Sequence, residues 1–168
     1  AHTFEIQIVS LKGATEMILS AFQFLLFGTL CAIVTSDIKV ILDNSKVLVK
    51  RTFSNKLYYI SKTSIAGFTQ AKEWCAANGG GYPAEIDTLE EFAFLESIIE
   101  PNGYLRVYIS GTDAQKDGTW VSQRTGVQLN VFDWLPGEPN NFAGPEDCLE
   151  LVTYLDGKLN DIACYAPE

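Results

Sequence analysis

Apolar residues recur along the middle of the chain at a spacing that predicts a helix. Phe68, Ala71 and Cys75 fall at positions i, i+3 and i+7, which is one face of an amphipathic helix. Trp74 lies beside that face, and Asn78 with the three glycines after it supplies a C-terminal stop. The pattern therefore predicts a helix that starts near Phe68 and turns Cys75 toward the core.

A second helix is predicted to begin at Thr88. Its hydroxyl can cap the helix while Glu91, three residues later, reaches back in the manner of a capping box. The buried stripe is continued by Phe92, Leu95 and Ile99. The segment Pro101-Asn-Gly103 supplies the stop.

Strand patterns lie on both sides of these helices. Residues 56–61 are rich in aromatic and β-branched side chains and predict a first strand, whereas 105–110 alternate between apolar and polar and predict a half-buried strand. Residues 37–55 form a connector that reads equally as a short neck or an extra strand. Residues 111–141 are loop-rich but contain Trp120 and Trp134, which argue for order. Two helices with strands and long loops indicate an α+β domain.

A long apolar run precedes all of these elements. Residues 18–36 contain no charge and follow Met17, the only methionine, so we interpret 17–36 as a signal peptide and 1–16 as sequence upstream of the natural start. An uncleaved membrane anchor is the competing interpretation. It is disfavoured because the basic residues cluster after the run, at Lys39, Lys46, Lys50 and Arg51. Removal of the segment would also remove Cys31.

The last segment predicts a disulfide-linked hairpin. Residues 148–154 are strand-like, Asp156-Gly157 is a preferred hairpin turn, and residues 159–164 return. Cys148 and Cys164 each lie eight residues from Asp156, so the hairpin brings them within reach of a disulfide bond. Cys75 would then be left as an odd thiol, which is unusual in the secretory route.

Charge and histidine content exclude several functions. The chain has a formal net charge of −9, with eight acids and one base between Asp133 and Glu168. Such a surplus disfavours nucleic acids and anionic membranes as partners and favours cations. The only histidine is His2, outside the predicted mature chain, so histidine-based acid–base catalysis is excluded there and we expect no enzyme.

Oxygen-bearing side chains crowd the segment between Trp134 and Cys148 and the returning strand. They are Glu138, Asn140, Glu146, Asp147, Asn160 and Asp161. No histidine or thiolate stands among them, and carboxylate and amide oxygens are the ligands that a hard cation such as Ca²⁺ prefers. The sequence therefore predicts a calcium site.

Three motifs in this region carry a family resemblance: Trp134-x-x-Gly-Glu-Pro-Asn140, Glu146-Asp-Cys148 and Asn160-Asp-x-x-Cys164. In this combination the chain from about Lys56 to Cys164 resembles a C-type lectin domain. The resemblance implies the C-type lectin fold over 56–168, with two helices, small antiparallel sheets and a long calcium-binding loop. It also implies that the final strand, with the usual partner of Cys75, is absent. We interpret the missing strand as a sign that the sequence is a fragment; a naturally shortened domain, or pairing of Cys75 between chains, is the alternative.

The resemblance further assigns roles to individual residues. Calcium and sugar would share five ligands: Glu138, Asn140, Glu146, Asn160 and Asp161. The Glu138–Pro139 bond would be cis, and the Glu-Pro-Asn order goes with mannose, fucose or N-acetylglucosamine. A second calcium would use Asp113, Asp117 and Asp147 with Glu146. Asn141 replaces a usual acid there and Leu159 a usual tryptophan, and loss of a charge should weaken the second site.

The expected function is that of a secreted, extracellular lectin that binds glycans or glycoproteins through Ca²⁺. Stable membrane insertion is not expected. A single shallow site binds weakly, so an oligomer would supply avidity. The alternative is a lectin-like domain that acts through protein–protein contacts without binding sugar.

Overall fold

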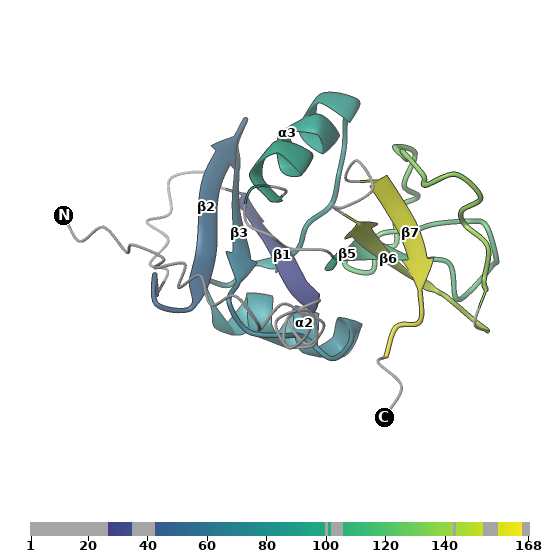
Figure 1. Cartoon of the computed structure of the whole chain (residues 1–168), viewed down its shortest axis with the longest axis horizontal. Coiled ribbons are helices and arrows are strands. Elements are labelled where there is room, and N and C mark those ends of the chain that lie inside the picture. The colour runs from purple at the N-terminus through teal and green to yellow at the C-terminus, as the bar shows by residue number, and fades with distance from the viewer. Residues whose placement is uncertain are drawn as a thin grey trace, which may run out of the picture.

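The computed structural model describes residues 27–34, 43–99, 101, 106–142, 144–152 and 158–165. Its two helices are α2 (Phe68–Ala77) and α3 (Leu89–Ile99). Its strands are β1 (Phe27–Val34), β2 (Val47–Phe53), β3 (Lys56–Ser61), β4 (Tyr82–Pro83), β5 (Arg106–Thr112), β6 (Cys148–Val152) and β7 (Lys158–Ile162). Figure 1 shows α3 and α2 on opposite sides of the β1–β3 region. The α+β class with two helices is confirmed.

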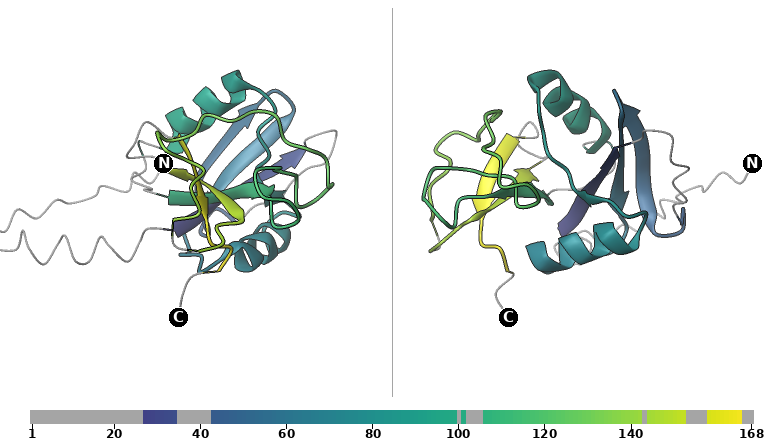
Figure 2. Two further views of the ribbon diagram at one scale, coloured as in Figure 1. Left: turned by 90° about the vertical axis from the view of Figure 1, so that its right-hand side faces the viewer. Right: turned by 180° about the vertical axis from the view of Figure 1, so that it is seen from behind.

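The described strands form one mixed sheet rather than separate antiparallel sheets. Their order is β2-β3-β1-β5-β6-β7, with β4 pairing β1 off this path. Strand β1 lies antiparallel to β3 and parallel to β5. The views in Figure 2 show β1 joining the helix-flanked end of the molecule to the end that carries β6 and β7.

Helix α2 begins and ends where the apolar spacing predicts, and it buries Phe68, Ala71 and Cys75. In α3, Phe92, Leu95 and Ile99 are buried as predicted.

The capping box of α3 is only half confirmed. The Glu91 amide donates to Thr88 Oγ1 at 3.1 Å, but the Glu91 carboxylate accepts from the Asp87 amide at 2.7 Å rather than from Thr88. That carboxylate is buried and also accepts from Lys56 and Tyr58, which draws it into the core.

Strand β5 differs from the half-buried strand that the alternation predicts. Tyr108 and Ser110, expected to face solvent, are buried with Val107 and Ile109. The reason is the position of β5 between β1 and β6, where Tyr108 packs edge-to-face against Phe68 of α2. Leu105, the first residue of the predicted strand, and the expected helix stop after Pro101 lie outside the described residues.

Strand β1 conflicts with the interpretation of residues 17–36 as a removed signal peptide. Leu30, Cys31 and Ala32 are fully buried, and Cys31 forms a disulfide bond with Cys75. Uniform apolarity is typical of a strand covered on both faces as well as of a leader. The partner of Cys75, expected beyond Glu168, is thus Cys31. Residues 1–26 and 35–36 lie outside the described part.

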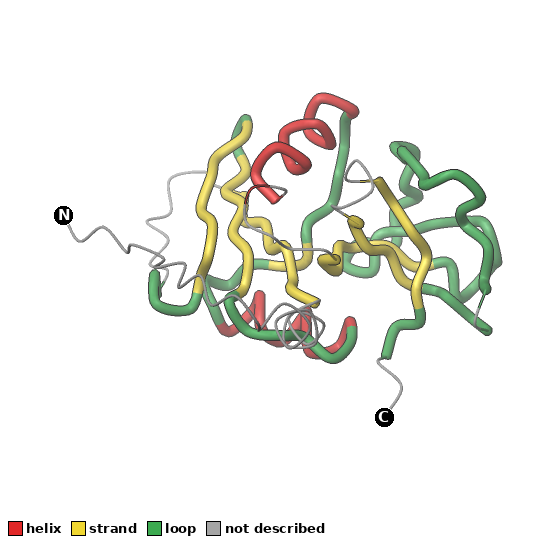
Figure 3. Tube along the Cα trace, viewed as in Figure 1, coloured by secondary structure: helices red, strands yellow, loops and turns green. Residues whose placement is uncertain are grey.

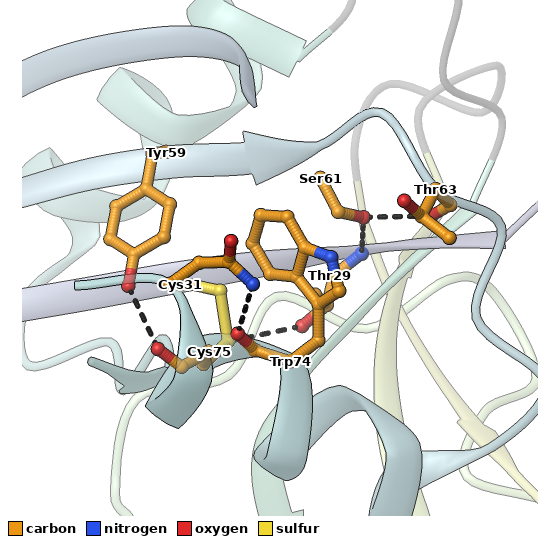
Figure 4. The surroundings of a disulfide bond; sticks show 8 residues. Thr29, Cys31, Tyr59, Ser61, Thr63, Trp74 and Cys75 are labelled. Carbon is orange, nitrogen blue, oxygen red and sulfur yellow. Dashed lines mark hydrogen bonds between the residues drawn. A yellow bond between two sulfur atoms is a disulfide. The ribbon is translucent and has the colours of Figure 1, made fainter. Parts of the chain in front are cut away.

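Figure 4 shows how the Cys31–Cys75 disulfide is enclosed. The Tyr59 hydroxyl donates to the Cys75 carbonyl at 3.3 Å, and the Thr29 amide donates to Ser61 Oγ at 3.1 Å. Strand β1 is therefore joined to α2 by a covalent bond and to β3 by the sheet ladder.

The connector contains a strand. Residues 47–53 form β2, antiparallel to β3, which decides between the neck and the extra strand for this part. Residues 37–42 lie outside the described chain.

The C-terminal hairpin is confirmed. Strands β6 and β7 pair antiparallel, and Cys148 and Cys164 form the predicted disulfide bond. The observed register sets Cys148 opposite Ile162. The Asp156-Gly157 turn itself lies outside the described residues.

Candidate functional site

The loop that follows β5 is anchored to β7 just before the candidate ligands begin. The Leu135 amide donates to the Leu159 carbonyl at 2.9 Å, and the Leu159 amide donates to the Asp133 carbonyl at 2.8 Å. Figure 3 shows the loops gathered at the β6–β7 end of the molecule. Leu159, buried in place of the expected tryptophan, therefore serves this anchor through its backbone.

Aromatic packing holds the same segment from the other side. Trp134 stacks on Phe132 with ring centroids 5.3 Å apart and lies 5.5 Å from Trp120. The tryptophans thus order the long loop, as their presence in the sequence indicates.

Asp161 anchors the loop a second time, beyond the Glu-Pro-Asn motif. Its carboxylate accepts the backbone amides of Asn140 at 3.0 and 3.2 Å and of Asn141 at 2.9 Å. Asp161 is 1% exposed, so these charge-assisted bonds are shielded from water. The Asn140 side chain is exposed.

Glu138 lies between these two anchors. Its peptide bond to Pro139 is cis, as the resemblance implies. The Oε2 atom of Glu138 is buried and has no hydrogen-bond partner among the described residues. Burial, followed by the nearby carboxyl groups of Asp161, Glu146 and Glu150, raises the pKa of Glu138 to about 7. An orphaned carboxylate oxygen beside other carboxylates is an environment that a cation would stabilise.

Glu146 and Asn141 close the loop on itself. The Phe142 amide donates to Glu146 Oε2 at 2.9 Å, and the Glu146 amide donates to Asn141 Oδ1 at 2.9 Å. Burial and the negative charge of Asp161 raise the pKa of Glu146, while the bond from Phe142 lowers it. Asn141 holds the left-handed conformation (φ 50°) that asparagine tolerates.

The residues expected at a second calcium lie along the neighbouring turn. Asp113 is buried and accepts the Gly118 amide at 2.8 Å. Burial, with the negative charges of Asp147 and Asp117, raises the pKa of Asp113. The side-chain amide of Asn141 donates to Asp117 Oδ1 at 3.0 Å, so the residue that replaces an acid is a hydrogen-bond donor to this carboxylate.

Asn160 has a buried neighbour that the motifs do not include. Its Nδ2 group donates to Glu150 Oε1 at 2.8 Å and to the Asp161 carbonyl at 2.5 Å. Glu150 is fully buried and is paired with Arg106, whose Nε donates to the same Oε1 at 2.9 Å. Sequence reasoning missed Glu150. The signal that could have found it is an acid within the apolar strand 148–152, at the position opposite Asn160 in the hairpin.

The donor set fits a hard cation in part. Glu138, Glu146 and Asp161 influence one another electrostatically, and the orphaned Glu138 oxygen lacks a positive partner. Within the described ranges, however, no three His, Cys, Asp or Glu side chains converge closely enough to hold a metal alone. The Asp161 carboxylate faces the loop amides instead. A cation held here would therefore also need amide oxygens, and Asn140 and Asn160 are the candidates that the sequence predicts.

Comparisons with known proteins agree with this fold. The chain is 31% identical to C-type lectin 37Db of Drosophila melanogaster over 112 residues, covering 66% of this chain and 72% of the fly protein. It spans less than half the length of the collectins that it also matches.

Two solved structures share the fold. The mouse scavenger receptor C-type lectin carbohydrate-recognition domain aligns with a TM-score of 0.58 and 26% identity, covering 69% of this chain and 87% of that domain. The cow CD23 carbohydrate-recognition domain, solved in the presence of a GlcNAc2Man3 oligosaccharide, aligns with a TM-score of 0.51 and 26% identity, covering 60% and 72%. Residues 64–168 match the Lectin C-type domain family. The chain belongs to the C-type lectin domain family.

Proposed function

We propose that this chain binds mannose-type sugars through a calcium ion held by Glu138, Asn140, Glu146, Asn160 and Asp161. The observation that carries the proposal is the buried Glu138 oxygen without a partner, set among carboxylates on a loop anchored twice to β7. When bound, Ca²⁺ would supply Lewis-acid coordination to the protein oxygens and to two adjacent sugar hydroxyls.

The protein side chains would orient the sugar. Ionised Glu138 and Glu146 accept hydrogen bonds, whereas the amide group of Asn140 can donate them. A pair of neighbouring hydroxyls would thus meet an acceptor on one side and a donor on the other. The Glu-Pro-Asn order supports mannose, fucose or N-acetylglucosamine, and the CD23 relative was solved with a mannose-containing oligosaccharide.

The first test is glycan-array binding of the full chain with calcium and with EDTA. We expect the mannose-type signal to disappear in EDTA and in Glu138→Gln. Glu90→Gln, an exposed acid in the first turn of α3, is the matched control and should bind like wild type. A signal that persists in EDTA would contradict the proposal and favour the protein-contact alternative.

Sugar preference gives a second test. Exchanging Glu138 to Gln and Asn140 to Asp reverses the order of amide and carboxylate along the loop. We expect preference to move from mannose toward galactose on the same array. Unchanged mannose preference in the double variant would contradict the assigned roles.

Location and partners form part of the same proposal. Two disulfide bonds favour an oxidising, extracellular compartment, where glycans and glycoproteins are the available partners. No described helix has the length and apolarity to cross a bilayer. A second calcium at Asp113, Asp117 and Asp147, and assembly into oligomers for avidity, complete the proposal, in which no catalytic role is assigned.

A further inference from the structure

Glu150 is a buried acid outside the five proposed ligands. It is 0% exposed, and its strand neighbours Leu149 and Leu151 are in the apolar core. A buried carboxylate is costly unless it is paired and hydrogen-bonded. Its Oε1 atom accepts from both Arg106 Nε, at 2.9 Å, and Arg106 Nη2. The arginine therefore holds this carboxylate in one orientation.

The sheet register explains how these groups meet. Glu150 on β6 lies directly opposite Asn160 on β7 and opposite Tyr108 on β5. Arg106 precedes Tyr108 by two residues, so both share a face of β5. Arg106 itself lies opposite Val152, diagonal to Glu150. Arg106, Glu150 and Asn160 thus form a hydrogen-bonded row across three adjacent strands that ends at a proposed ligand.

This row decides which end of the Asn160 amide faces the site. Both acceptors of Asn160, Glu150 Oε1 and the Asp161 carbonyl, contact the Nδ2 atom, and a side-chain NH₂ has two hydrogens to donate. A flipped amide would set Oδ1 against the Glu150 carboxylate and lose both bonds. The Oδ1 atom is therefore the end left available to a cation.

We propose that Glu150, held by Arg106, is a positioning residue that orients Asn160 so that its oxygen meets calcium. This inference rests on the proposed function. It assigns no contact between Glu150 and the ion, because Glu150 acts through the Asn160 amide. Outer groups that orient metal ligands typically change metal affinity by about 10–100-fold.

The test measures Ca²⁺ affinity of the full chain by isothermal titration calorimetry. Glu150→Gln offers Asn160 an uncharged partner, and we expect affinity to fall by about 10–100-fold. The matched control is Glu85→Gln, because Glu85 is also a buried acid paired with an arginine, Arg124, at 2.6 Å and bonded to a hydroxyl, that of Ser122. The Ca²⁺ affinity of Glu85→Gln should stay within about twofold of wild type, because Arg124 and Ser122, the partners of Glu85 in these bonds, are not among the proposed ligands.

Repeating the measurement in an Asn160→Asp variant separates an effect on the orientation of residue 160 from a general loss of Ca²⁺ affinity. In Asn160→Asp the ligand has two equivalent oxygens, so its orientation no longer matters and Glu150→Gln should not weaken binding further. The Asn160 side-chain amide signals in a ¹⁵N–¹H spectrum should also shift in Glu150→Gln before calcium is added. If Glu150→Gln lacks a cooperative unfolding transition, Glu150→Asp, which draws the charge back by one methylene, replaces it with the same expectation.

The outcomes are distinguishable. Wild type without measurable Ca²⁺ binding would overturn the proposed function itself. Wild-type binding with Glu150→Gln equal to Glu85→Gln would overturn the positioning role alone. An equal loss from Glu150→Gln in the wild-type and Asn160→Asp backgrounds would also overturn it, because the effect would then be independent of amide orientation.

Discussion

The two ends of the molecule are held together by different forces. At the β1–β3 end, strands packed by α2 and α3 bury large apolar side chains such as Tyr58, Ile60 and Leu95. At the β6–β7 end, the loop is held by side chains that hydrogen-bond to backbone, with Asp161 and Glu146 as acceptors. The first end is stabilised chiefly by apolar burial, whereas the loop at the second end depends on side-chain acceptors in addition to its apolar packing.

Buried acids make the difference clearer. Glu91 at the first end accepts from Lys56, Tyr58 and the Asp87 amide, so both its oxygens are satisfied. Glu138 and Glu150 at the second end each retain a buried oxygen without a described partner. Unsatisfied buried oxygens are costly for stability, and for Glu138 the proposed calcium ion would complete the bonding.

Removal of β1 is the change for which this contrast predicts the largest effect. Deleting residues 1–36 takes away a central strand and Cys31, and we expect loss of the cooperative thermal transition measured by circular dichroism. Deleting residues 1–26 leaves β1 intact and serves as the control, which should unfold cooperatively. Equal transitions in the two variants would show that β1 is dispensable and restore the signal-peptide interpretation.

The two disulfides test the contrast next. The Cys31–Cys75 and Cys148–Cys164 bonds span 44 and 16 residues of sequence separation. Chain entropy predicts losses of about 4 and about 3 kcal/mol when each pair is changed to alanine. We expect Ca²⁺ affinity, measured by calorimetry at a temperature where both variants are folded, to fall more for the Cys148–Cys164 pair. The reverse order of calcium affinities would contradict the division into two regions.

Gly111 tests the boundary between the regions. It lies where the β5–β6 register shifts, and a Cβ atom there would stand 2.2 Å from Leu149 Cδ1 and 2.8 Å from Leu149 Cγ. Because Leu149 is buried, we expect Gly111→Ala to lower the free energy of unfolding by about 1–3 kcal/mol in denaturant titrations. The same change in a Leu149→Ala background should cost less. Equal costs in both backgrounds would exclude this contact as the cause.

The smallest expected effect is the pH dependence of the calcium-free protein. Because the pKa of Glu138 is raised from 4.5 to about 7, the folded state binds this proton more tightly than the unfolded chain. Its contribution to stability is present below about pH 4.5 and is lost as pH rises toward 7. In EDTA, the melting temperature of wild type should therefore fall relative to Glu138→Gln across this window. Parallel profiles would contradict the raised pKa.

Much of this architecture could be predicted from local pattern. Helices α2 and α3 follow from the 3.6-residue spacing of residues such as Phe68, Ala71 and Cys75, and the spacing about Asp156 predicts the Cys148–Cys164 bond. These features depend on neighbours close in sequence. The five proposed ligands were found in a different way, by motif, because they lie on separate segments of the chain and no periodicity reveals the loop anchors at Leu159 and Asp161.

What could not be predicted depends on distant pairing. A charge-free run from residue 18 to 36 has the same composition whether it is a leader or a strand covered on both faces, so β1 was missed. The prediction that Tyr108 faces solvent was wrong, because the alternation of apolar and polar residues does not show that α2 covers this side chain. The role of Glu150 could be predicted only once the register of β6 and β7 is known, because that register places Glu150 opposite Asn160.

The place of β1 in the sheet also has a consequence for synthesis of the chain. Among the described strands β1 is synthesised first, yet its partner β5 ends at Thr112, 78 residues after Val34. At ordinary translation rates β1 waits on the order of several seconds for β5, while its native partner β3 is synthesised earlier. The edge of β1 that pairs with β5 therefore stays uncovered during that interval, and we expect the yield of the protein to respond to conditions that hold early segments soluble.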